Sequence, residues 1–277
     1  MGVAQRHGQH MNEVHDKVDR KSRKLFVAML VASFLSVPAV MHAGVDSSSD
    51  ALTPGEILDR VDDVFRGESS VGRASMTIVT KHWTRTLVID FWSRGKEKSL
   101  IRILEPAKER GTATLKVGRE LWNYLPKVNR VIKLPSSMMS ASWMGSHFTN
   151  DDLVRQSRMS EDYDFEVSFE GKREGVEVVE LTCIPKEDAA VVWGKVVVLV
   201  ERARYLPLSV LYHNEDLELM RTMTYSNVRE LDGRALPTEI VIVPHDETGE
   251  KTRVEYQTID FDSVKDDELF SLRELQR

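Results

Sequence analysis

The chain has 277 residues, of which 41% are apolar and 30% charged, and this composition excludes both an intrinsically disordered chain and one that lies mainly within a membrane. Its formal net charge is −6 at pH 7, so it lacks the basic excess with which nucleic-acid-binding proteins neutralise phosphates. The single cysteine, Cys183, excludes an internal disulfide and is expected to be a small buried residue in a strand.

The N-terminal region has the pattern of a secretory signal peptide. A basic cluster at residues 20–24 precedes an uncharged, mainly apolar run at 25–40, and Ala43 follows shortly after it. As a helix this run rises about 24 Å, which is short of the ~30 Å hydrocarbon core of a membrane. Residues 1–43 are therefore predicted to be a cleaved signal peptide, with an uncleaved N-terminal anchor as the alternative. Because no cysteine follows the apolar run, a lipoprotein anchor is not expected.

The first predicted helix follows a short polar stretch. Residues 44–52 are rich in Ser and Asp and are expected to be a flexible N-terminus. Thr53 then precedes a proline and lies three residues before Glu56, which is a capping box with proline at the first helical position. Apolar residues recur at helical spacing as far as Gly67, so one amphipathic helix is predicted. Residues 53–277 are expected to form a single domain.

From Gly72 onward, apolar and polar residues alternate with a period of two, which is typical of strands with one buried face. Glycine-containing turns such as Leu-Asp-Gly-Arg at 231–234 separate the runs and indicate an antiparallel meander. The explicit runs are 85–92, 97–104, 119–125, 129–134, 163–170, 175–184, 191–201, 205–213, 217–229, 235–243 and 251–261. About ten or eleven strands are therefore predicted to form one strongly curved, mainly antiparallel sheet.

A curved sheet of this size encloses more space than its predicted helices fill. Eight strands closed on themselves hold only side chains or one small ligand, and a wider or incompletely closed sheet leaves a cavity unless helices plug it. The further helices are short: one is capped by Thr149, has Asp152 at its third position and runs to about Gln156, and another begins near Asp266. A hollow apolar interior is therefore expected, with a filled sandwich core as the alternative.

Residues 135–148 show neither a period of two nor a clean helical period. A structureless stretch of this length inside a compact domain is usually functional or disordered. Methionine and aromatic side chains suit adaptable apolar contact, so we interpret the stretch as a lid or as part of the mouth of an apolar site. The alternative is that these side chains simply cover an edge of the sheet. The candidate ligand or lid contacts are Met138, Met139, Trp143, Met144 and Phe148.

The sequence offers little support for catalysis. It lacks the Gly-x-Ser-x-Gly and His-Glu-x-x-His motifs and a glycine-rich phosphate loop. His147 with Asp151 and Asp152 has the residue types of a metal site, and nearby serines could form a nucleophile pair with this histidine. Acidic residues at a helix start more often serve the cap and the helix dipole, and loop serines more often bond to the backbone. We therefore predict no catalytic residues, metal or cofactor, and an esterase is a weaker alternative.

A series of ordered motifs runs through the chain. They are Glu105-Pro106, Gly111-Thr112, Leu121-Trp122-Asn123-Tyr124-Leu125-Pro126, Arg130, Trp143-Met144-Gly145-Ser146, Phe148-Thr149, Asp151-Asp152-Leu153, Asp162-Tyr163 and Asp267, Leu269, Phe270. In these motifs the chain resembles the outer-membrane lipoprotein-sorting protein family of Gram-negative bacteria, from about Thr53 to Leu275. It departs from the family at His147, where Asp is usual, and at Asn150, where an aromatic residue is usual.

The resemblance implies an unclosed antiparallel β-barrel whose helices form a lid over an apolar cavity. It implies a monomeric, non-enzymatic carrier in the periplasm that binds a lipid or the acyl part of a lipoprotein. The alternative is an accessory or interaction module of an RND-type exporter or of an envelope signalling system. Trp122 and Tyr124 are further ligand candidates, with a role as fold determinants as the alternative. Arg94 and Arg130 are candidates for contact with a headgroup or for a latch.

Overall fold

The computed structural model describes residues 52–155, 159–264 and 266–277, which belong to one compact unit, Asp50–Arg277. The predicted signal peptide at residues 1–43, and almost all of the predicted flexible N-terminus at 44–52, lie outside the described residues. In the part of the chain that is described, no helix combines the length and the apolar character needed to cross a membrane.

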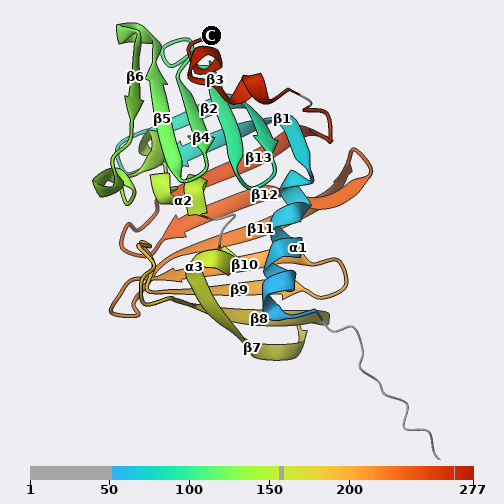
Figure 1. Cartoon of the computed structure of the whole chain (residues 1–277). Coiled ribbons are helices and arrows are strands. Elements are labelled where there is room, and N and C mark those ends of the chain that lie inside the picture. Colours follow the sequence, from blue (N-terminus) through green and yellow to red (C-terminus); the bar gives the residue numbers. More distant parts are fainter. Residues whose placement is uncertain (1–51, 156–158, 265) are drawn as a thin grey trace, which may run out of the picture. The chain divides into compact units, whose positions relative to one another are not determined.

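Thirteen antiparallel strands in the described residues form one sheet (Figure 1). The strands are β1 (Ser69–Val79), β2 (Thr84–Arg94), β3 (Lys98–Glu105), β4 (Ala113–Val117), β5 (Glu120–Leu125), β6 (Arg130–Lys133), β7 (Tyr163–Arg173), β8 (Val176–Pro185), β9 (Lys195–Glu201), β10 (Leu206–His213), β11 (Leu219–Leu231), β12 (Arg234–Pro244) and β13 (Lys251–Phe261). Their order is β6-β5-β4-β3-β2-β1-β13-β12-β11-β10-β9-β8-β7, so the first strand pairs with the last. This seam joins two meanders in which consecutive strands are neighbours.

The sheet is not closed, because β6 and β7 form its two edges within the described part of the chain. These strands are consecutive in sequence, so the connecting segment between them, residues 134–162, has to pass from one edge of the sheet to the other. Its described parts lie on the same side of the sheet as the helix α1 (Pro54–Arg66) (Figure 1). The mainly β fold with an unclosed antiparallel sheet confirms the fold class predicted from the sequence.

The number of strands exceeds the ten or eleven predicted, because the predicted runs begin at residue 85 and do not include β1 or β4. The buried positions of β1 include Ser70, Gly72 and Ala74, whose small side chains give only weak hydrophobic alternation. Four of the five residues of β4 are buried, because C-terminal residues pack on one face of this strand and Trp143 contacts the other. A strand covered on both faces loses the period of two.

The first two helices begin where the sequence predicts, whereas α3 was not predicted. At the start of α1 the Thr53 hydroxyl accepts a hydrogen bond from the Glu56 backbone N–H, and the Glu56 carboxylate accepts one from the Thr53 backbone N–H at 2.7 Å. Thr149 and Asp152 cap α2 in the same reciprocal way. The shorter helices are α2 (Asn150–Arg155), α3 (Met159–Asp162) and α4 (Leu272–Leu275), with 3₁₀ turns at Pro126–Val128, Ser136–Met138, Trp143–Gly145 and Asp267–Phe270.

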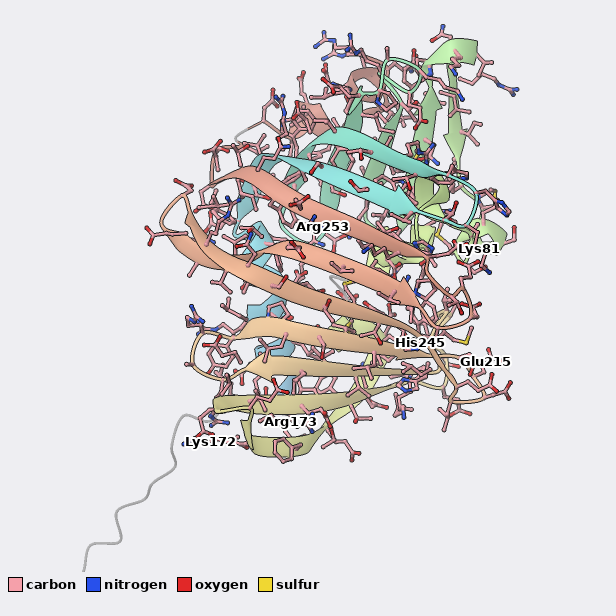
Figure 2. The ribbon with its side chains drawn as sticks, turned by 180° about the vertical axis from the view of Figure 1, so that it is seen from behind. Lys81, Lys172, Arg173, Glu215, His245 and Arg253 are labelled. Carbon is pink, nitrogen blue, oxygen red and sulfur yellow. The ribbon has the colours of Figure 1, made fainter. Side chains whose placement is uncertain are left out.

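The largest cluster of buried side chains lies between the sheet, α1 and the connecting segment. We call the face of the sheet that α1 covers the inner face. A second cluster lies between strands β3 to β5 and the C-terminal residues, where Leu100 and Leu115 pack with Phe270 and Leu275. Figure 2 views the sheet from behind, so that α1 lies beyond the strands and the outer face is toward the reader. The inner face is therefore the one that can enclose a site.

Candidate functional site

A cavity of about 230 Å³ lies between α1, the inner face of the sheet and the connecting segment. Most of its lining is apolar, and strands on both sides of the β1–β13 seam contribute to it. The apolar and aromatic lining residues are Leu58, Val61, Phe65, Ala74, Met76, Ile89, Phe91, Trp92, Ile101, Trp143, Phe148, Leu153, Met159, Val198, Pro207, Val210, Tyr212, Tyr225, Ile240, Val254 and Tyr256.

The register of the sheet brings alternate residues of neighbouring strands to this cavity. Ala74 of β1 lies opposite Ile89 of β2 and Tyr256 of β13. Val254 of β13 in turn lies opposite Ile240 of β12. Because side chains two residues apart on a strand share a face, the period-two pattern of the sequence becomes a continuous apolar wall.

Aromatic contacts hold α1 over this wall. The ring centroid of Phe65 lies 5.6 Å from that of Tyr256 and 6.1 Å from that of Tyr225. Phe91 meets Tyr256 edge to face at 5.6 Å. Burial raises the pKa of both tyrosines above the ordinary value, so their hydroxyls stay neutral at physiological pH. The wall of the cavity is therefore uncharged where α1 packs on it.

Polar side chains line the cavity where α1 faces the β2–β3 turn. Lys96 of that turn pairs with Asp59 of α1, and the Ser160 hydroxyl donates a hydrogen bond to the same carboxylate at 3.3 Å. On α1 itself, Arg66 Nε donates to Asp62 Oδ1 at 2.8 Å. The cavity thus combines an apolar wall with a charged, hydrogen-bonded rim.

Three of the predicted ligand or lid candidates lie together in the connecting segment above the sheet. Trp143 is 3% exposed, lines the cavity and donates a hydrogen bond from Nε1 to Thr114 Oγ1 at 3.0 Å. Its backbone N–H donates to the carbonyl of Phe148 at 2.7 Å, and Phe148 also lines the cavity. Met144 packs against the main buried cluster, and its carbonyl accepts a hydrogen bond from Arg85. Their role in ligand contact stays a prediction.

The two remaining methionine candidates lie elsewhere. Met138 is 47% exposed, and its carbonyl accepts a hydrogen bond from Asn150 Nδ2 at 2.9 Å. Met139 packs against a separate small cluster that contains Leu121 and Leu134. Neither methionine is among the residues that line the cavity.

The other four candidates also lie outside the lining of the cavity. Tyr124 of β5 belongs to the second buried cluster and Trp122 packs against it, which fits the alternative interpretation of them as fold determinants. The Arg94 guanidinium donates to Asp267 Oδ1 at 2.9 Å, and Arg130 is exposed at the start of β6. Headgroup contact or latching by these two arginines stays a prediction.

A buried ion pair that the sequence analysis missed joins the connecting segment to the sheet. Arg221 of β11 donates to the two carboxylate oxygens of Asp152 at 2.8 and 2.5 Å, and the two side chains are only 5% and 6% exposed. The same guanidinium donates to the carbonyl of His147 at 2.7 Å. It lies 4.4 Å from the ring centroid of Trp193 and 4.1 Å from that of Tyr212. Asp152 also lines the cavity.

One feature of the sequence indicates that Arg221 is buried and paired. Arg221 lies two residues before Met223 and four before Tyr225, and both of these residues pack within the main cluster. An arginine in phase with inward-facing residues is buried, and a buried charge has to be paired. No local pattern, however, identifies Asp152 as the partner.

His147 lies apart from the acidic residues that follow it in the sequence. Asp152 pairs with Arg221, whereas the His147 ring lies beside Thr252, Glu247 and Glu250. Ser146 donates a hydrogen bond to the Trp143 carbonyl at 2.7 Å, which is the backbone role expected of a loop serine. The metal arrangement of His147, Asp151 and Asp152 considered from the sequence is therefore not the arrangement found.

Comparisons with known proteins agree with this architecture. Residues 95–277 match the model of a family whose members are described as uncharacterized proteins, and no curated protein matches the chain. An outer-membrane lipoprotein-sorting protein domain from Vibrio parahaemolyticus is 25% identical, with a TM-score of 0.71 over 80% of this chain and 98% of that one.

Two further solved structures, each 23% identical to this chain, share its fold. A DUF1329 family protein from Desulfovibrio piger has a TM-score of 0.73 over 80% of this chain and 97% of that one. A LolA superfamily protein from Nitrosomonas europaea has a TM-score of 0.69 over 81% of this chain and 100% of that one.

Proposed function

We propose that this chain, which belongs to the family whose model matches residues 95–277 and is similar in fold to an outer-membrane lipoprotein-sorting protein domain, is a periplasmic carrier that binds the acyl part of a lipid or lipoprotein in its cavity. The predicted signal peptide at residues 1–43 would deliver it to the periplasm. The observation that carries the proposal is the apolar cavity between α1, the sheet and the connecting segment.

The hydrophobic effect supplies the driving force for such a carrier. Each buried methylene contributes ~0.8 kcal/mol, so an acyl chain of a dozen or more carbons in water carries a penalty on the order of 10 kcal/mol. A cavity walled by apolar and neutral aromatic side chains removes much of this penalty without a cofactor or nucleotide. Transfer then requires only a receiving protein or membrane that binds the acyl chain better.

The size of the cavity implies that it opens to take up cargo. About 230 Å³ is below the ~300–1,000 Å³ of pockets that hold drug-sized ligands. Trp143 and Phe148 line the cavity, and the connecting segment that carries them is held to the sheet by the Arg221–Asp152 pair and by the Trp143–Thr114 hydrogen bond. Outward movement of this segment would enlarge the cavity and expose its wall to an acyl chain.

The lining also favours binding over catalysis. Among the described residues, neither histidine nor cysteine lines the cavity, so a nucleophile and a histidine base do not meet there. The Cys183 thiol is buried elsewhere in the core, and burial raises its pKa to about 12, so it is not an activated nucleophile. We therefore propose a non-enzymatic protein.

Native mass spectrometry with organic extraction tests this proposal on protein purified from a bacterial periplasm. The wild-type protein is expected to carry an extractable lipid or acyl chain, and Trp143→Asp is expected to lose it because a charge then faces the cavity. Met138→Asp is the matched control, since it places the same charge on an exposed side chain of the same segment. Thermal unfolding of each variant checks that it is folded.

A lipid-free wild-type protein that takes up no lipid from vesicles would overturn the carrier proposal. Equal lipid content in the Trp143→Asp and Met138→Asp variants would separate any bound lipid from this cavity. In either case the alternative function, an accessory module of an RND-type exporter or of an envelope signalling system, would be pursued by isolating periplasmic and inner-membrane partners.

A further inference from the structure

Three potential metal ligands meet where the connecting segment touches the turn at residues 245–250, between β12 and β13. His147 Nε2 lies 3.4 Å from Glu247 Oε2 and 3.5 Å from Glu250 Oε2. The ligand atoms of all three residues lie within 4.8 Å of one another. Figure 2 labels Lys81 and His245 near this place, at the strand ends on the right of the view. The group is separate from the cavity, because none of its members lines it.

The spacing suits a shared cation better than direct hydrogen bonds. Hydrogen bonds from N–H to oxygen join atoms about 2.7–3.2 Å apart, and both His147 distances are longer. Zinc binds nitrogen and carboxylate oxygen at about 2.0–2.2 Å in tetrahedral geometry, which separates neighbouring ligand atoms by about 3.3–3.6 Å. The two observed distances fall within that range.

Neighbouring groups orient two of the three ligands, His147 and Glu250, toward each other. Thr252 Oγ1 lies 2.8 Å from His147 Nδ1 and accepts the His147 backbone N–H at 3.0 Å, so the ring is held with Nε2 toward the carboxylates. The backbone N–H of Lys81 donates to Glu250 Oε1 at 3.1 Å, which leaves Oε2 directed at His147. Hydrogen bonds of this kind orient the ligands in protein metal sites.

Burial and charge also fit a cation. The side chains of His147 and Glu250 are each only 10% exposed, whereas that of Glu247 is 49% exposed and gives access from solvent. The carboxylates of Glu247 and Glu250 supply negative charge that can balance a bound cation. His245, on the same turn, bonds instead to Thr222 Oγ1 at 2.9 Å.

We propose that His147, Glu247 and Glu250 form a binding site for a divalent transition-metal cation of the Zn²⁺ class. Three protein ligands leave a fourth tetrahedral position for water. The imidazole ligand favours such a cation over Mg²⁺ and Ca²⁺, which prefer all-oxygen sites. The bound cation ties the connecting segment, through His147, to the rim of the sheet. Metal binding at this site does not depend on the identity of the cargo.

Isothermal titration calorimetry with ZnCl₂ on the chelator-treated protein, together with native mass spectrometry, tests the site. The wild-type protein is expected to bind one Zn²⁺ per chain. Replacement of a ligand in His147→Gln or Glu250→Gln, or of the orienting hydroxyl in Thr252→Val, is expected to weaken binding by about 10–100-fold. His245→Gln, a change of another histidine on the same turn, is the matched control and is expected to bind as the wild type does.

The Zn²⁺-binding test remains informative even if a substitution at the largely buried His147, Glu250 or Thr252 unfolds the protein. Glu247→Gln changes a half-exposed ligand and so leaves the fold intact, and it is expected to weaken Zn²⁺ binding as well. Zn²⁺ is also expected to raise the Tm of the wild-type protein but not that of the Glu247→Gln variant, because the site exists only in the folded state. A wild-type protein that does not bind Zn²⁺, prefers Mg²⁺, or binds Zn²⁺ as tightly after Glu247→Gln and His147→Gln would overturn the proposal.

Discussion

Arg221 links three parts of the molecule through one side chain: its own strand β11, the helix α2 and the backbone at His147. Removing one partner of a buried ion pair leaves the other charge unpaired and costs about 3–5 kcal/mol. We therefore expect Arg221→Met to lower the free energy of unfolding by about this amount, because Asp152 loses both hydrogen bonds from Arg221. Equilibrium unfolding in urea measures the change.

The double variant Arg221→Met with Asp152→Leu distinguishes the contribution of the ion pair to stability from that of the other contacts of Arg221. Replacing both charges by apolar side chains removes the unpaired carboxylate, and such replacements are often close to neutral. The double variant is therefore expected to recover most of the stability lost in the single variant. If it is as unstable as Arg221→Met alone, the contacts of the guanidinium with Trp193 and Tyr212 matter more than the ion pair does.

Individual residues show how much of the candidate site could be predicted from the sequence. The irregular stretch 135–148 with its aromatic side chains pointed to the part of the chain that carries Trp143 and Phe148, and both line the cavity. Met138 is also a large apolar residue in this stretch, but it is exposed. Composition alone does not determine which way a side chain in an irregular segment points. Arg221 was missed because it pairs with a residue on another element, and a strand arginine is ordinarily expected at the surface.

Among the elements, β1 depends on a glycine at the seam of the sheet. A Cβ added at Gly72 would lie 2.2 Å from the Thr258 carbonyl oxygen and 2.5 Å from the Phe91 ring. The neighbouring register shift between Arg73 and Ala74 leaves this part of the β1–β13 pairing already irregular. The glycine thus lets the backbone of β13 and an aromatic ring of the cavity wall approach β1 closely.

Gly72→Ala is therefore expected to push β1 away from β13. Overpacking of this kind typically costs about 1–3 kcal/mol, so a lower free energy of unfolding in urea is expected. Ser75→Ala on the same strand is the control, because it removes an oxygen without adding an atom at the seam, and little change is expected. Unchanged stability of Gly72→Ala would show that the two strands separate there without cost.

The elements differ in how well the sequence reveals them. The capping box at Thr53 and Glu56 is a local pattern, and α1 begins there as predicted. Pairing of β1 with β13 joins residues at opposite ends of the domain, such as Ser70 and Phe261, and no local pattern encodes it. The small inward residues of β1 and the double burial of β4 weaken alternation, which is why the strand count was too low.

At the scale of the whole molecule, the cavity follows from strand order. Because β6 and β7 occupy opposite edges, the segment between them has to connect these edges, and its described parts lie on the inner face beside α1. Period-two patterns predicted the curved sheet, and the size of the sheet predicted an interior that its few helices do not fill. The volume of the cavity could not be predicted, because it depends on how α1 and the connecting segment pack.

If the cavity holds an acyl chain, a larger side chain in its lining is expected to compete with the acyl chain for space. Ala74 lines the cavity and is 1% exposed, so Ala74→Leu adds three carbons to that space. Displacing two or three methylenes of the cargo costs about 2 kcal/mol, which corresponds to a loss of roughly 30-fold in lipid affinity. Fluorescent fatty-acid titration measures the affinity of the wild-type protein and of the variant.

Ser75→Leu is the matched control for this prediction, because it adds a side chain of the same size on the opposite face of the same strand. It is expected to bind lipid as the wild-type protein does, and thermal unfolding establishes that both variants are folded. Equal loss of lipid binding in the two variants would mean that a larger side chain on β1 disturbs the fold and not the cavity. Equal retention would place the lipid elsewhere on the molecule and would contradict the proposed role of the cavity.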